Sequence, residues 1–145
     1  MPQWKKCLGA EPNTGNPGTF NLSNAPMISI VDDDESVRES TKALVRSLGY
    51  GARTFSSAEE FLCSNPDDTN CLIVDVQMKG ISGVELHERL IAVGRQTPTI
   101  FITAYADERT RSRALGAGAI AFLRKPFSDE KLTTSIEAAL ANCAS

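Results

Sequence analysis

The chain has 145 residues, a length typical of one globular domain. Hydrophobic residues make up 41% and charged residues 23%, which excludes a disordered chain, and the longest apolar runs are too short to span a bilayer. The formal net charge of −3 lacks the basic excess of a nucleic-acid binder, so we expect this chain to make no direct contact with nucleic acid or with a membrane.

The cysteines and the start of the chain indicate the cellular compartment. Four cysteines without a CxxC pair, and a single histidine, argue against a zinc site and favour reduced thiols. Lys5 and Lys6 are not followed by the apolar segment of a signal peptide. We therefore expect a cytoplasmic protein.

Residues 1–26 differ from the rest of the chain. They are rich in turn-forming glycine, proline and asparagine and show no apolar period. We expect them to form a flexible N-terminal extension without a function of its own, or alternatively an arm that docks on a partner or on the domain itself. The folded domain is expected over residues 27–145.

Short apolar runs alternate with amphipathic segments in the first half of this domain. Asp34 is expected in the cap region of the first helix, Gly49 at its end, and Ser57 opens the next helix with a capping-box pattern. The expected strands are residues 27–31, 50–55 and 72–74.

The second half continues the alternation, with strands expected at residues 99–102 and 120–123 and helices at 107–115 and after Ser128. A further helix is expected after Ser82, with Leu86, Leu90 and Ile91 facing inward. His87 lies beside this apolar stripe and is expected on the surface.

Five strand and helix units in this order are typical of an α/β fold. We expect a doubly wound, five-stranded parallel sheet flanked by five helices, a flavodoxin-like architecture. In such sheets, ligands bind beyond the carboxyl ends of the strands.

Polar residues follow four of the five predicted strands. Asp32 and Asp33 end the first strand, Asp75 the third, Thr103 the fourth and Lys125 the fifth. Carboxylates brought together at one edge repel each other unless a cation is present, and Mg²⁺ prefers such oxygen ligands. An aspartate beside Mg²⁺ and a lysine is suited to accept a phosphoryl group.

Four motifs at these strand ends also occur in a fixed order. They are Val31-Asp32-Asp33-Asp34, Val74-Asp75 with the loop over residues 77–86, Ile102-Thr103-Ala104, and the segment over residues 116–127 that includes Lys125-Pro126. Together they resemble the receiver domain of two-component response regulators, most closely the nitrogen-fixation-type regulators, over residues 27–142.

The resemblance implies a role for each residue of the site. Asp75 would accept the phosphoryl group from a sensor histidine kinase or a phosphotransfer protein. Asp33, Asp75 and the carbonyl of Gln77 would bind Mg²⁺ directly, and Asp32 through water. Lys125 would contact the phosphoryl group, and a cis peptide would precede Pro126. The protein would assist its own phosphorylation and dephosphorylation without being an enzyme in the ordinary sense.

The resemblance also implies a switch. Thr103 would move toward the phosphoryl group and Phe122 would turn inward, which would remodel the face made by the fourth helix, the fifth strand and the fifth helix. That face would contact a downstream effector protein or output domain, or a second copy of the chain upon phosphorylation.

One departure and two alternatives accompany this interpretation. The family usually has proline where Lys79 stands, and the lysine adds a positive charge near the site. The chain could be the receiver part of a DNA-binding transcription regulator. An aspartate-nucleophile phosphohydrolase is disfavoured because it needs a second carboxylate two residues after the nucleophile, where this chain has Gln77.

Overall fold

Five parallel strands form one sheet at the centre of the computed structural model, which describes residues 25–64, 69–105 and 107–143. The strand order is β2-β1-β3-β4-β5, so the direction in which successive strands are added to the sheet reverses between β1 and β3. The strands are β1 (Met27–Val31), β2 (Gly51–Phe55), β3 (Cys71–Asp75), β4 (Thr99–Thr103) and β5 (Ala121–Arg124).

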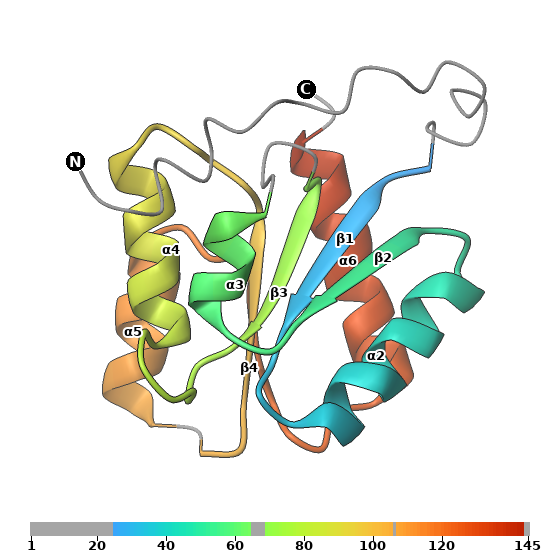
Figure 1. Ribbon diagram of the computed structural model, residues 1–145, viewed down its shortest axis with the longest axis horizontal. Coiled ribbons are helices and arrows are strands. Elements are labelled where there is room, and N and C mark those ends of the chain that lie inside the picture. The colour runs from blue at the N-terminus through green and yellow to red at the C-terminus, as the bar shows by residue number, and fades with distance from the viewer. Residues whose placement is uncertain (1–24, 65–68, 106, 144–145) are drawn as a thin grey trace.

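Helices cover both faces of this sheet, as Figure 1 shows. Helices α3, α4 and α5 lie on one side, and α2 and α6 on the other. Their bounds are α2 (Glu35–Ser47), α3 (Ala58–Cys63), α4 (Gly83–Ala92), α5 (Glu108–Gly116) and α6 (Asp129–Cys143). The predicted doubly wound, flavodoxin-like fold is confirmed.

Local sequence signals set the helix ends. The Asp34 side chain accepts hydrogen bonds from the backbone N–H groups of Ser36 and Val37 and so caps α2. Gly49 follows α2 with a φ of 94°, a conformation that favours glycine. Ser57 and Ser82 cap α3 and α4 through their side-chain oxygens, as predicted.

The two faces of the sheet have different cores. We call the side covered by α2 and α6 the aliphatic face; its buried side chains include Ile30, Ile100, Ile102, Leu132 and Ile136. We call the side covered by α3, α4 and α5 the aromatic face; its buried side chains include Phe55, Phe61, Leu86, Leu90 and Phe101. Because side chains alternate along a strand, β4 contributes to both faces.

Two expectations for α4 were wrong. His87 is 4% exposed and packs edge-on against Phe101, with ring centroids 5.4 Å apart, whereas it was expected on the surface. Ile91, expected to face inward, is 42% exposed. Ile91 lies one turn beyond His87, near the end of α4. There its side chain borders an open cavity of about 460 Å³, which Pro98 and Ile120 also line.

Part of the predicted domain organisation lies outside the described residues. Of the predicted N-terminal extension, only residues 25 and 26 are described. Within the described part of the chain, no helix is both long and apolar enough to cross a membrane.

Candidate phosphoryl-acceptor site

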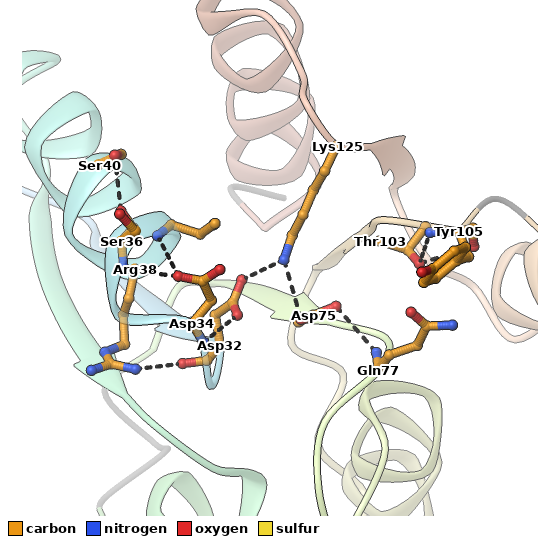
Figure 2. Close-up of polar contacts among 11 residues, drawn as sticks. Asp32, Asp34, Ser36, Arg38, Ser40, Asp75, Gln77, Thr103, Tyr105 and Lys125 are labelled. Carbon is orange, nitrogen blue, oxygen red and sulfur yellow. Dashed lines mark hydrogen bonds and ion pairs between the residues drawn. The ribbon is translucent and has the colours of Figure 1, made fainter.

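Three charged side chains meet at the carboxyl edge of the sheet, next to β1 and β3, the two strands between which the strand order reverses. The Nζ atom of Lys125 donates hydrogen bonds to Asp32 Oδ2 at 3.0 Å and to Asp75 Oδ2 at 3.2 Å. Figure 2 shows the lysine reaching from the end of β5 to both carboxylates. Three residues separated widely in the sequence are thereby joined in one ion-pair network.

Backbone groups hold the remaining carboxylate oxygens in place. Asp32 Oδ1 accepts from the N–H of Asp34 at 2.9 Å, and Asp75 Oδ1 accepts from the N–H of Gln77 at 3.1 Å. Asp32 is fully buried and Asp75 is 4% exposed. The strand-end turns therefore fix the orientation of both acids.

Burial and the neighbouring carboxylate of Asp32 govern the protonation of Asp75. Desolvation, followed by the charge of Asp32, raises the pKa of Asp75 to about 6, although the hydrogen bonds from Gln77 and Lys125 oppose the shift. Burial alone would lower the pKa of Lys125, but its hydrogen bonds to Asp32 and Asp75 and their charges outweigh that effect and raise it. The lysine therefore stays charged, and Asp75 holds its proton to a higher pH than an ordinary aspartate.

The acids also form a group suited to a divalent cation. One carboxylate oxygen each of Asp32, Asp33 and Asp75 can be chosen so that all three lie within 4.8 Å of one another. Asp33 is exposed, which leaves this side of the group open to solvent. Hard carboxylate oxygens at this spacing fit Mg²⁺.

Thr103, in contrast, is not joined to this network. Its buried hydroxyl donates to the backbone carbonyl of Tyr105 at 2.9 Å and accepts from the N–H of the same residue at 3.1 Å. Figure 2 shows Thr103 bonded to Tyr105, with no dashed line from Thr103 to Asp75 or Lys125. Thr103 thus closes the turn after β4.

Phe122 lies on the aromatic face beside the same strand. It is half-buried, and its ring centroid lies 6.3 Å from that of the fully buried Phe101. Since Phe101 and Phe122 are register partners between β4 and β5, His87, Phe101 and Phe122 form a continuous row of rings from α4 to β5. The peptide bond between Lys125 and Pro126 is cis, as predicted.

The profile of the response regulator receiver domain matches residues 28–137 of the chain. The chain belongs to the response regulator receiver family. The fold and the position of the acids at the sheet edge agree with this membership, and the resemblance noted from the motifs is confirmed.

Individual response regulators are similar over most of the chain. The response regulator protein TodT of Pseudomonas putida is 43% identical over 142 residues, which are 97% of this chain and 63% of TodT. The transcriptional regulatory protein FixJ of Bradyrhizobium diazoefficiens is 37% identical over 114 residues, 78% of this chain and 56% of FixJ. The expected likeness to nitrogen-fixation-type regulators is thus confirmed.

A solved structure supports the same assignment. The structure of the response regulator StyR has a TM-score of 0.77 and 44% sequence identity, and it covers 83% of this chain and 61% of the StyR chain. The chain therefore spans about three fifths of the length of several relatives that it matches.

Two residues that support this receiver site were missed in the sequence. Arg38 donates from Nη1 to the backbone carbonyl of Asp32 at 2.7 Å and so ties α2 to the first acidic turn (Figure 2). At Gly83, a Cβ atom would collide with the carbonyl oxygen of Asp75, so only glycine lets α4 begin this close to the end of β3. Arg38 could have been suspected as the first cation after the three aspartates.

Proposed function

We propose that the chain accepts a phosphoryl group on Asp75 from a sensor histidine kinase or a phosphotransfer protein. The observation that carries this proposal is the pair of hydrogen bonds from Lys125 to Asp32 and Asp75. A half-buried lysine between two buried acids supplies a nucleophilic carboxylate together with a cation that can contact the incoming phosphoryl oxygens.

The donor set favours Mg²⁺ as the accompanying ion. We assign Asp33, Asp75 and the backbone carbonyl of Gln77 as direct ligands and Asp32 as a ligand through water; the spacing of the three acids supports this. When bound, Mg²⁺ supplies positive charge that offsets the charge on the phosphoryl oxygens during transfer.

The proposed transfer uses the chain's own groups as follows. A carboxylate oxygen of Asp75 attacks phosphorus in line while the bond from phosphorus to the donor nitrogen breaks, and the electron pair of that bond stays with the donor. Since the pKa of Asp75 is about 6 before an ion binds, the carboxylate is mostly ionised at pH 7 and above. Lys125 then contacts the transferred group.

The response to phosphorylation is proposed to start at Thr103. Its hydroxyl would exchange the carbonyl of Tyr105 for a phosphoryl oxygen, and Phe122 would turn from its half-buried position toward the space that Thr103 leaves. The surface formed by α5, β5 and α6 would change as a result. In this mechanism the chain assists its own phosphorylation and dephosphorylation and has no separate substrate to turn over.

The partners follow from this proposal. The changed surface would contact a downstream effector protein or an output domain, or would pair with a second copy of the chain. TodT and FixJ carry the names of a response regulator and a transcriptional regulator, and the chain spans only part of each, so an output through a DNA-binding domain is a second candidate. The receiver itself would act in the cytoplasm without direct contact with nucleic acid or a membrane.

A phosphohydrolase function has less support. Such enzymes need an acid two residues after the nucleophile, and the amide of Gln77 cannot donate a proton to a leaving group in that way.

The decisive experiment is intact-mass analysis after incubation with acetyl phosphate and Mg²⁺. We expect the wild-type chain to gain the mass of one phosphoryl group and Asp75→Asn to gain none. Asp33→Asn serves as a second variant, which should be phosphorylated more slowly. A wild-type chain that gains no phosphoryl group, or an Asp75→Asn variant that gains one as fast as wild type, would contradict the proposal.

A further inference from the structure

A hollow of about 570 Å³ opens beside the acidic group, between the loop after β3 and helix α5. Asp33 and Gln77, both assigned to the phosphoryl site, line it. Two cationic side chains, Lys79 and Arg113, line it as well. When a donor transfers its phosphoryl group to Asp75, its leaving group needs room next to the acceptor. This hollow provides that room.

The two cations are not equivalent. Arg113 makes two hydrogen bonds to Glu88, from Nε at 2.9 Å and from Nη2 at 2.8 Å, so a neighbouring carboxylate offsets its charge. Lys79 is exposed and forms no ion pair with any residue in the described part of the chain. The charge of Lys79 is therefore available to a molecule that enters the hollow.

The positive charge of Lys79 is a departure of this chain from the family pattern. The family pattern usually has proline at this place in the loop, and proline would leave the hollow without the ammonium group. Lys79 is only four residues after Asp75, on the loop that also supplies Gln77. A donor bound at Asp75 would thus meet the ammonium group of Lys79 in the hollow.

We propose that Lys79 determines donor preference and favours acyl phosphates, whose leaving group is a carboxylate. This inference rests on the proposed function. In the reaction with an acyl phosphate, the bond between Asp75 and phosphorus forms as the bond from phosphorus to the acyl oxygen breaks. The carboxylate leaves with the electron pair as an anion and needs no proton. The Lys79 ammonium stabilises the negative charge that develops on this leaving group.

A donor with a phosphorus–nitrogen bond provides the comparison. Phosphoramidate delivers the same phosphoryl group, but its nitrogen is already protonated and leaves as neutral ammonia. The ammonium of Lys79 gains nothing from a neutral leaving group. The ratio of the two rates therefore isolates the effect of Lys79 on the leaving group from any effect on Asp75 or on the metal ligands.

The test measures initial phosphorylation rates of the full chain with each donor in the presence of Mg²⁺. For Lys79→Gln we expect the rate with acetyl phosphate to fall about three- to fivefold, the effect of one partly solvated charge at several ångströms, and the phosphoramidate rate to change by less than about 1.5-fold. Lys79→Arg should retain the wild-type ratio. Lys131→Gln, which removes another exposed lysine that lines a different groove, is the matched control.

The outcomes separate this inference from the proposed function. Equal losses with both donors would show that Lys79 acts on the acceptor or on metal binding, and would overturn the inference. Unchanged rates with both donors would overturn it too. In either case the proposed function would stand, because the wild-type chain would still be phosphorylated on Asp75. A wild-type chain that accepts a phosphoryl group from neither donor would contradict both.

Discussion

On one face of the sheet, Ile100 and Ile102 of β4 lie among aliphatic side chains beneath α2 and α6. On the other face, Phe101 of the same strand lies between the rings of His87 and Phe122. The aliphatic face buries mainly branched aliphatic side chains. The aromatic face includes a buried imidazole nitrogen, His87 Nδ1, that has no hydrogen-bond partner among the residues that the structure describes.

This difference shows where the molecule can change its packing. Cavities adjoin both sides of the sheet, one of about 460 Å³ beside His87 and one of about 490 Å³ between α2 and the start of α6. The two sides differ instead in the row of rings from His87 to Phe122, which ends at the half-buried strand β5 next to β4. A half-buried ring can turn without displacing close-packed side chains. We therefore expect α2 to stay in place while the row of rings and the surface formed by α5, β5 and α6 respond to phosphorylation.

The largest expected effect comes from truncating a buried leucine on each face. Leu132→Ala, on the aliphatic face, should lower the free energy of unfolding by about 3–4 kcal/mol, and Leu90→Ala, on the aromatic face, by about 2–3 kcal/mol. Both side chains are at most 1% exposed. However, His87 and Ile91, the neighbours of Leu90 on α4, line a cavity toward which they can relax. Urea unfolding measures both values. A greater loss for Leu90→Ala would contradict the comparison.

A smaller effect is expected at His87. Burial lowers the pKa of His87 below 6.5, although the charge of Glu88 opposes the shift. The folded state therefore prefers the neutral ring, and stability is lost as the pH falls below 6.5 because the unfolded chain then binds a proton more readily. His87→Leu should raise the free energy of unfolding by about 1 kcal/mol at pH 7.5, and by more at pH 5.5.

The pH dependence of stability also contains a contribution from Asp75, which has to be separated from that of His87. The raised pKa of Asp75 acts in the opposite direction, because the folded state then binds a proton more readily than the unfolded state as the pH falls through about 6. Subtracting the wild-type curve from that of His87→Leu removes the Asp75 contribution, which both proteins share. A difference that does not depend on pH between 7.5 and 5.5 would exclude titration of a buried His87.

The smallest expected change in stability belongs to Phe122. Because the side chain is only half-buried, Phe122→Leu should lower the free energy of unfolding by less than about 1 kcal/mol. Its effect on the response should be larger, since a smaller, non-aromatic side chain fills the space left by Thr103 differently. Phosphorylated Phe122→Leu should therefore show a weaker change in amide exchange over α5 than phosphorylated wild type. An unaltered change would remove Phe122 from the switch.

The sequence allowed the fold and the charged part of the site to be predicted because both depend on local patterns. Strand ends can be located from apolar runs, and in a parallel sheet they must meet at one edge, which brings Asp32, Asp75 and Lys125 together. The caps at Asp34 and Ser82 likewise depend on neighbours within three residues.

Features that depend on the rotation of a helix against the sheet could not be predicted in this way. His87 was assigned to the surface because imidazole is polar and adjoins the stripe, yet Phe101 on β4 provides a ring for it to pack against. The reach of Arg38 to the carbonyl of Asp32 depends on a side-chain conformation. The position of Arg38 after the three aspartates makes it a candidate, but the spacing of residues identifies neither its partner nor that of His87.

Hydrogen exchange of the wild-type chain, with and without acetyl phosphate and Mg²⁺, tests the central claim most directly, with Asp75→Asn as the control. We predict that phosphorylation changes amide exchange in α5 and β5, on the aromatic side, and leaves α2 unchanged, and that Asp75→Asn shows neither change. Changes of equal size in α2 and α5, or changes that persist in Asp75→Asn, would contradict a switch that starts at Asp75 and is transmitted through the aromatic face.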